Sequence, residues 1–169
     1  MDLFLMRHGE AGKRVPIAAK DTERPLTAAG RQEIEDVAEG IAELGYKFDA
    51  VVSSPLKRAK DTATMVSKAL GRKAAVEEWS ELNPEGNTTD FYRRLAKMRP
   101  GSVVLCVGHE PYLTTVIGEI TGREMEGNPG FRISLKKGGL AKVSVTGFNP
   151  RISGELRWLL TPRQIRKMA

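Results

Sequence analysis

Short apolar runs alternate along this chain with segments whose apolar residues recur at helical spacing. The runs Leu3–Met6, Phe48–Val52 and Ser102–Val107 each have the length of one strand, and the last is apolar at every position after Ser102. Continuous apolar runs of this kind are typical of strands buried on both faces. The alternation predicts an α/β fold, a three-layer α/β/α sandwich with a mainly parallel central sheet.

The predicted helices begin and end at residues that favour helix ends. Thr27 is the expected N-cap of the first, and Gly45 ends it. Ser54 and Pro55 are expected to cap and open the second, which ends near Gly71. Further helices are predicted over 89–98, over 112–120 and, in short form, behind Pro162.

The C-terminal part of the chain has a different pattern. Phe131–Leu135 and Leu140–Val145 are predicted to form a hairpin through the turn at 136–139. Glu155–Leu160 is predicted to be the last strand. No internal repeat or linker divides the chain, so we expect one domain over residues 1–169.

Basic residues exceed acidic residues by 27 to 21, which gives the chain a net charge of +6. This surplus favours anionic partners such as phosphate esters or acidic protein surfaces, and a merely soluble basic surface explains it equally well. The densest basic cluster is Arg163, Arg166 and Lys167, which is too short for a nucleic-acid-binding arm. Nucleic acid is therefore not an expected partner.

The chain has one cysteine, Cys106, so no intramolecular disulfide can form and a reducing compartment is expected. Cys106 lies in the predicted buried strand, which favours a structural thiol over a nucleophile. No apolar run approaches the length of a membrane span, and the first six residues lack the basic start of a secretion signal. We expect a cytoplasmic protein without a membrane partner.

Unusual polar residues follow three of the predicted strands. Arg7 and His8 follow the first, Ser53 to Arg58 the second, and His109 the third, so both histidines of the chain fall at strand ends. Ligands of open α/β sheets bind beyond the carboxyl ends of the strands. One histidine after a strand is more often structural, but three such clusters at one sheet edge indicate an anion-binding site.

The sequences of these clusters resemble the motifs of the histidine phosphatase superfamily. They read Leu-Met-Arg-His-Gly-Glu at 5–10, Val-Ser-Ser-Pro-x-x-Arg-Ala-x-x-Thr at 52–62 and Val-Gly-His-Glu at 107–110. Further segments resemble the SixA-type phosphohistidine phosphatases within it: Arg-Pro-Leu-Thr at 24–27, Glu-Leu-Asn-Pro-Glu-Gly at 81–86 and Leu-Arg-Trp-Leu-Leu-Thr-Pro at 156–162. The resemblance extends over almost the whole chain and implies the fold of that superfamily.

The resemblance also implies a role for each matched residue. His8 is the expected nucleophile, and it would hold the phosphoryl group covalently until water releases it. Arg7, Arg58 and His109 are the expected substrate-binding residues, which complete the catalytic set with His8. The chemistry agrees, because guanidinium groups stay charged and bind phosphate oxygens in pairs, while an imidazole can donate to the oxygen that gains charge.

Neither a metal nor a cofactor is expected. Two histidines, one buried cysteine and no clustered carboxylates do not form a zinc or dinuclear site, and no glycine-rich phosphate loop is present. A metal-independent phosphatase follows from this. Glu10 and Glu110 are interpreted as residues of the pocket rim.

The leaving group favours one substrate class. Phosphoglycerate mutases that resemble this chain carry a glutamate acid directly after a Leu-Asn pair, whereas Pro84 stands there in this chain and Glu85 comes one residue later. The sequence leaves open whether Glu85 or Glu10 assists as an acid. An imidazole, with a pKa of about 6.5, leaves without much help, whereas an alkoxide needs an acid.

This argument favours protein phosphohistidine, with a phosphorylated protein as the partner. The alternatives are a small-molecule phosphomonoesterase that uses the same pocket and, less favoured, a non-catalytic phosphoprotein-binding module.

Overall fold

The computed structural model describes residues 1–14, 16, 21–72, 75–122 and 133–169. Six strands form one sheet in the order β3-β2-β4-β1-β5-β6. Their bounds are β1 (Asp2–Arg7), β2 (Ala50–Ser53), β3 (Glu77–Glu78), β4 (Val103–Gly108), β5 (Leu140–Gly147) and β6 (Ser153–Leu160). Neighbouring strands are parallel from β3 to β1, and β5 is antiparallel to both β1 and β6. The prediction of a mainly parallel sheet is confirmed.

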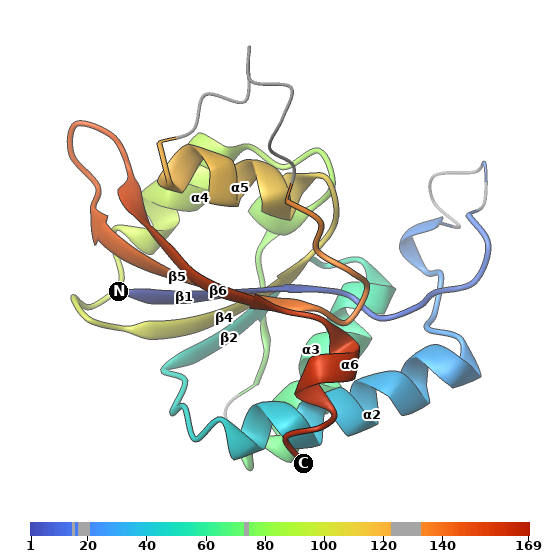
Figure 1. The fold of residues 1–169 in the computed structure, drawn as a ribbon. Coiled ribbons are helices and arrows are strands. Elements are labelled where there is room, and N and C mark those ends of the chain that lie inside the picture. Colours follow the sequence, from blue (N-terminus) through green and yellow to red (C-terminus); the bar gives the residue numbers. More distant parts are fainter. Residues whose placement is uncertain (15, 17–20, 73–74, 123–132) are drawn as a thin grey trace.

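Helices cover both faces of this sheet (Figure 1). One face carries α4 (Thr88–Leu95) and α5 (Tyr112–Ile120), and the other carries α2 (Ala28–Glu43), α3 (Lys57–Ala69) and α6 (Pro162–Ile165). A short 3₁₀ helix, η1 (Ser80–Leu82), lies between β3 and α4 along the chain. This arrangement is the predicted three-layer sandwich.

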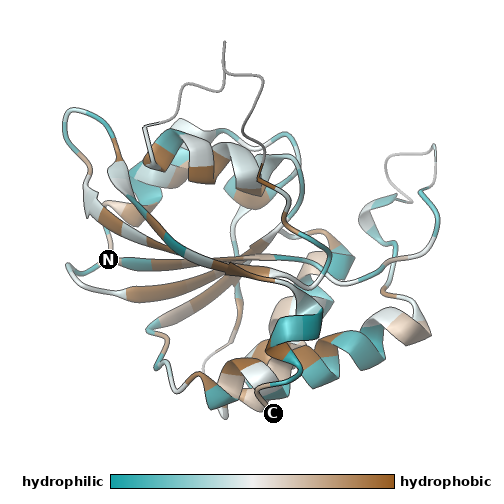
Figure 2. Cartoon of the chain, viewed as in Figure 1, coloured by the Kyte–Doolittle hydropathy of each residue, from teal (hydrophilic) through white to brown (hydrophobic). Residues whose placement is uncertain are grey.

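The central strands contribute side chains to two cores. On β1, Leu3 and Leu5 pack into the core beneath α4 and α5, while Phe4 and Met6 pack into the core beneath α2 and α3. All four side chains are fully buried. Figure 2 shows the apolar strands between helices whose outer faces are hydrophilic. A strand buried on both sides gives the continuous apolar run that the sequence shows.

The predicted N-cap of α2 is confirmed, and the predicted N-cap of α3 is wrong. Thr27 caps α2 and accepts a hydrogen bond from the backbone N–H of Gly30, as predicted. The expectation that Ser54 caps α3 and that Pro55 opens it is wrong, because α3 begins at Lys57 and Leu56 holds the cap position without a side-chain bond. The Ser54 hydroxyl instead donates to Oδ1 of Asn83 and accepts from the backbone N–H of Leu56.

The predicted hairpin is a second correction. Residues 131–132 lie outside the described part of the chain, and 133–135 form no strand. The strand predicted at Leu140–Val145 is β5, but its partners are β1 on one edge and β6 on the other, which leaves no free edge for a third strand. The turn at 136–139 is real: Gly138 has φ +69° and donates its N–H to the carbonyl of Arg7, so the turn packs on the end of β1.

Two short elements, β3 and η1, have no counterpart among the predictions. The strand β3 consists of two glutamates, which have no strand propensity that the sequence could reveal. It forms because these residues pair with the edge of β2. Among the residues that the structure describes, no helix combines the length and the apolar character needed to cross a membrane.

Candidate active site

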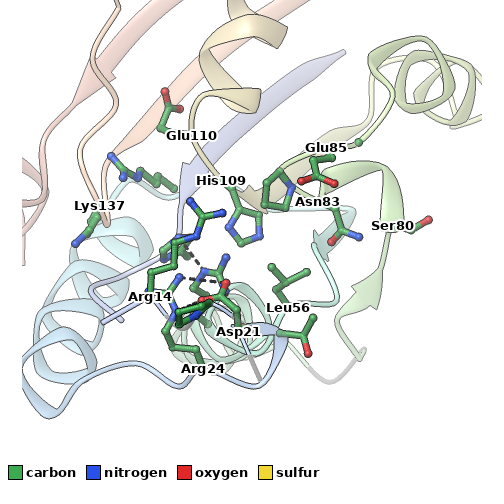
Figure 3. A pocket seen from close by; sticks show the side chains of 17 residues that line it. Arg14, Asp21, Arg24, Leu56, Ser80, Asn83, Glu85, His109, Glu110 and Lys137 are labelled. Carbon is green, nitrogen blue, oxygen red and sulfur yellow. Dashed lines mark hydrogen bonds and ion pairs between the residues drawn. The ribbon is translucent and has the colours of Figure 1, made fainter. Parts of the chain in front are cut away.

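The carboxyl ends of β1, β2 and β4 open into a pocket of about 950 Å³ (Figure 3). The structure brings all four residues singled out in the sequence to this pocket: Arg7, His8, Arg58 and His109. The remaining lining residues are Arg14, Pro16, Asp21, Thr22, Arg24, Leu56, Ser80, Asn83, Pro84, Glu85, Gly86, Glu110 and Lys137. Parallel strands end at the same sheet edge, which explains why motifs about fifty residues apart meet here.

His8 presents one bare nitrogen. Its Nδ1 lies 2.7 Å from the carbonyl oxygen of Gly9, an acceptor, so Nδ1 carries the ring proton and donates it. Its Nε2 accepts from Nε of Arg58 at 3.3 Å. The ring is 7% exposed. Burial lowers the pKa of His8 to about 4, and the positive charges of Arg58 and Arg7 act in the same direction against the bond to Gly9. His8 is therefore neutral at neutral pH.

Arg58 stands in the first turn of α3 and is 4% exposed. Its Nη1 donates to the backbone carbonyl of Asp21 at 3.0 Å and lies 3.5 Å from the Asp21 carboxylate. The same carboxylate pairs with Nε of Arg24 at 2.9 Å. Asp21 thus holds two guanidinium groups of the pocket in place, and it balances part of their charge.

Arg7 and Lys137 also line the pocket, Arg7 at the end of β1 and Lys137 in the turn at 136–139. Nη1 of Arg7 donates to the carbonyl of Leu135 at 3.0 Å, and its buried Nε has no hydrogen-bond partner among the described residues. Lys137 pairs with Glu10 at 2.9 Å. The segment 135–139 therefore supplies a cation to the pocket and a backbone acceptor to Arg7.

His109 lies beside His8, with 4.9 Å between the ring centroids. It is 2% exposed, and its Nε2 is 2.9 Å from the hydroxyl of Ser54. Burial lowers the pKa of His109 to about 2, and the neighbouring His8 and Arg58 lower it further. The two imidazoles are both neutral, inside a site whose fixed charges are largely guanidinium.

Three carboxylates named in the sequence analysis take different positions. Glu110 lines the pocket, accepts from the hydroxyl of Thr114 at 2.7 Å, and has its pKa raised by burial. Glu10 does not line the pocket and pairs with Lys137. Glu85 does line it, with an exposed side chain, so its displacement by one residue does not remove it from the pocket.

Sequence reasoning missed Asp21, Asn83 and Lys137. Nothing in the sequence marks Asp21, because its partner Arg58 is 37 residues away. Lys137 was placed in the turn of a hairpin. Four basic residues lie in the segment from Gly12 to Pro25. Arg14 and Arg24 line the pocket, Lys13 does not, and Lys20 lies outside the described residues.

Metal ligands are not gathered in the described part of the chain, where no group of three or more His, Cys, Asp or Glu side chains could hold an ion. Cys106 is fully buried in β4, and burial raises the pKa of its thiol. It is a structural residue, as its sequence context predicted.

Comparison with known proteins gives consistent matches. A profile of the histidine phosphatase superfamily (branch 1) matches residues 3–84. An uncharacterized protein of Picosynechococcus is 34% identical over 143 residues, covering 83% of this chain and 82% of its own. Phosphohistidine phosphatase SixA of Escherichia coli is 29% identical over 171 residues, covering 100% of this chain and 98% of its own. The solved structure of the protein histidine phosphatase SixA complexed with tungstate has a TM-score of 0.79 and 27% identity, covering 96% of this chain and 98% of that one.

Proposed function

This chain belongs to the histidine phosphatase superfamily, and from that premise we propose that it is a protein phosphohistidine phosphatase acting through a covalent phospho-His8 intermediate. Membership and the full-length relative support a phosphatase, a hydrolase of phosphoryl groups. The phosphohistidine substrate and the covalent step are the proposal. The name of the Escherichia coli relative supports the substrate class.

The observation that carries the proposal is the bare Nε2 of His8 inside a cationic pocket. Nε2 releases the hydrogen bond that it accepts from Arg58, and its lone pair attacks phosphorus. A bond from His8 to phosphorus forms, and the bond from phosphorus to the substrate nitrogen breaks. The substrate imidazole departs with the electron pair of the broken bond, and a phosphohistidine that is protonated on its other ring nitrogen leaves as neutral imidazole without taking up a further proton. Because Nδ1 stays bonded to Gly9, the nucleophilic nitrogen keeps its orientation through the step.

Arg7, Arg58 and His109 surround the transferred group. The guanidinium groups of Arg7 and Arg58 bind phosphoryl oxygens, and His109 donates to an oxygen as its charge grows. Phosphoryl transfer needs little beyond such positioning and charge stabilisation. Asp21 holds Arg58 in place without occupying its whole donor fork.

Water completes the cycle. It attacks phosphorus and the bond from phosphorus to His8 Nε2 breaks. The phosphate leaves with both protons of the water, as H2PO4⁻, and His8 returns to its neutral form with the proton on Nδ1. The overall reaction converts phosphohistidine and water into histidine and phosphate, and no step in it calls for a metal ion. The partner is a protein that carries phosphohistidine, and the single cysteine fits a reducing compartment such as the cytoplasm.

Glu85 favours a second candidate, a small-molecule phosphomonoesterase. A carboxylic acid on the pocket wall is able to protonate an alkoxide leaving group, and Glu85 lines this pocket. The two candidates share the phosphoenzyme and differ in whether Glu85 matters.

One set of assays tests both. We expect the pure protein to hydrolyse a phosphohistidine peptide far faster than a phosphoserine peptide or phosphoglycerate, and His8→Ala to abolish all turnover while the protein stays folded. Glu85→Gln is expected to change phosphohistidine turnover less than about threefold, since this leaving group needs little acid assistance. Equal turnover of phosphoserine or phosphoglycerate that is lost in Glu85→Gln would establish the second candidate instead. Substantial turnover by verified His8→Ala protein would refute the covalent mechanism.

A further inference from the structure

The hydroxyl of Thr62 connects the loop after β1 to the start of α3. Thr62 is fully buried, one helical turn beyond Arg58. Its Oγ1 accepts a hydrogen bond from the backbone N–H of Gly9 at 3.1 Å and donates to the backbone carbonyl of Arg58 at 2.7 Å. One side chain therefore contacts both the residue after His8 and the residue that is expected to bind phosphate.

The directions of these two bonds are consistent with each other. A hydroxyl has one proton and two lone pairs. The proton of Thr62 goes to the carbonyl of Arg58, and a helical threonine often donates in this way to the carbonyl four residues earlier. The lone pairs are then available to the N–H of Gly9, which is a donor only. Thr62 itself does not line the pocket.

Gly9 is the residue that holds the His8 ring. Its carbonyl oxygen lies 2.7 Å from Nδ1 of His8. A Cβ at Gly9 would lie only 2.6 Å from Cγ1 of Ile34 on α2, so the backbone passes too close to this helix for a side chain. A glycine has more backbone freedom than any other residue, and the direction of its carbonyl therefore depends on how its peptide groups are held. Thr62 holds the N–H of Gly9.

We propose that Thr62 is a positioning residue that keeps the His8 ring oriented for attack. By holding the N–H of Gly9, the hydroxyl directs the Gly9 carbonyl at Nδ1, so that the ring proton stays on Nδ1 and Nε2 stays bare. By donating to the carbonyl of Arg58, the same hydroxyl ties this loop to α3. The inference rests on the proposed function for the role of His8 as nucleophile.

Loss of the hydroxyl should slow phosphoryl transfer more than it weakens phosphate binding. Without Thr62 Oγ1, the N–H of Gly9 is a buried donor that lacks an acceptor, which favours a shift of the backbone. The Gly9 carbonyl then moves away from Nδ1, and the His8 ring is free to rotate. A misplacement of about 1 Å costs roughly 100-fold in rate, whereas the guanidinium groups of Arg7 and Arg58 still bind an oxyanion.

Three variants separate positioning from a general effect on the fold. Thr62→Val has nearly the same shape without the hydroxyl, and we expect it to lower kcat/KM for an aryl phosphate roughly 10- to 100-fold while the inhibition constant of inorganic phosphate changes less than about threefold. Thr62→Ser keeps the hydroxyl and should bring kcat/KM back to within about threefold of wild type. Thr121→Val is the matched control, because Thr121 also donates to the carbonyl four residues earlier, that of Ile117, and lies outside the pocket lining. Its kcat/KM should stay as in wild type.

Spectra of the whole protein without substrate test the geometry directly. Two-bond ¹H–¹⁵N correlations separate protonated from bare ring nitrogens, and His8→Ala identifies which of the two histidine signals belongs to His8. In wild type we expect the proton on Nδ1 of His8, and slow exchange with water of both this proton and the Gly9 amide proton. In Thr62→Val both protons should exchange about tenfold faster, and in Thr62→Ser close to the wild-type rate. These readouts do not depend on the substrate, so they stay valid if the phosphohistidine assignment fails.

The proposal is overturned if folded Thr62→Val keeps the kcat/KM of wild type, or loses it together with an equal weakening of phosphate inhibition. It is equally overturned if Thr62→Ser does not recover activity, or if Thr121→Val loses as much as Thr62→Val. If Thr62→Val does not fold, wild type and Thr62→Ser decide. Protected protons on Nδ1 of His8 and on the Gly9 amide in both proteins support the proposal. A His8 proton on Nε2, or a Gly9 amide that exchanges as fast as an exposed one, overturns it.

Discussion

The two histidines of the pocket are held neutral by the same surroundings that make the pocket attractive to an anion. Burial removes water that would stabilise an imidazolium, and Arg7 and Arg58 repel the added proton. A neutral His8 retains the lone pair that the proposed attack on phosphorus requires. At the residue scale, the charge of the site therefore rests on its arginines.

The dependence of activity on pH, on the acid side, should report the lowered pKa of His8. His8 has a pKa of about 4, and protonation removes its nucleophilic lone pair. We expect kcat/KM for an aryl phosphate to stay level on the acid side of neutrality and to fall about tenfold per pH unit below roughly pH 4. An initial-rate series from pH 3.5 to 8 measures this. An acid limb that is centred near 6.5 would contradict the assignment, because an ordinary histidine titrates there.

The same shift predicts how stability depends on pH. The pKa of His8 is about 4 in the folded state and about 6.5 in the unfolded state, so between these values the unfolded chain binds a proton that the folded chain does not. The free energy of unfolding therefore does not depend on His8 above pH 6.5 and decreases as the pH falls toward 4. For His8 alone this decrease is about 3 kcal/mol.

Urea unfolding at pH 7.5 and pH 4.5 measures this loss. We expect the free energy of unfolding to fall less between these two pH values in His8→Ala than in wild type. An equal fall in the two proteins would show that His8 titrates alike in the folded and unfolded chains.

At the scale of elements, one wall of the pocket is a tightly built loop between η1 and α4. Arg94 of α4 lies 4.2 Å from the ring centroid of Trp79 and binds both carboxylate oxygens of Glu81, at 3.1 and 3.0 Å. Gly86 closes the loop against the backbone, and a Cβ there would collide with the carbonyl oxygen of Glu81. The position of Asn83 depends on this packing.

Gly86→Ala should therefore disturb the wall. The added methyl group meets backbone that cannot rotate away, so we expect a loss of about 1–3 kcal/mol in the free energy of unfolding and a clear drop in kcat/KM. Gly12→Ala is the control, because a Cβ at Gly12 meets nothing within 4 Å. Thermal melts and turnover of both variants decide the point. If the two variants have equal melting temperatures and equal turnover, the loop accommodates the methyl group without loss of stability.

Local signals predicted the elements well, and non-local contacts account for the errors. The helix at 112–120 and the Thr27 cap follow from periodicity and capping within a few residues. The hairpin failed because strand pairing is decided across the sheet: β5 pairs with β1, more than 130 residues away.

The same limit holds for the candidate site. Arg7, His8 and His109 stand at the ends of strands that the apolar pattern reveals, and Arg58 stands in the first turn of the helix that follows β2, so the sequence was sufficient to predict that these side chains meet at one pocket. The contacts of Asp21 with Arg58 and of Asn83 with Ser54 join distant segments and leave no local pattern.

At the scale of the whole molecule, the described residues gather no metal-ligand cluster, and the charge of the site is supplied by side chains of the chain itself. We therefore expect full phosphohistidine turnover after exhaustive treatment with chelator followed by gel filtration. Metal analysis of the treated protein is the control. Activity that disappears and returns on addition of zinc, magnesium or manganese would contradict a metal-independent mechanism.

Basic side chains outnumber carboxylates in the pocket lining: Arg7, Arg14, Arg24, Arg58 and Lys137 face Asp21, Glu85 and Glu110. Figure 3 shows Arg14 among the side chains that project into the pocket. Arg24 pairs with Asp21 and Lys137 with Glu10, whereas Arg14 is exposed and has no ion pair with any residue that the structure describes. Burial lowers the pKa of Arg58, and the charges of Arg24 and Arg14 act in the same direction against the Asp21 carboxylate.

The positive charges around the pocket should increase the rate at which an anionic phosphoprotein associates with it. Salt screens charges over about 10 Å at 0.1 M ionic strength and about 3 Å at 1 M, so we expect kcat/KM to fall with added salt while kcat changes little. Arg14→Gln should lower kcat/KM at low salt and flatten its salt dependence. Lys13→Gln removes the same charge from a neighbouring exposed position that does not line the pocket, so its salt dependence should stay close to that of wild type. Parallel salt series on the three proteins, with one phosphohistidine protein as substrate, measure the difference. If both variants flatten the dependence equally, the effect belongs to net charge alone, and Arg14 has no special place in guiding the substrate to His8.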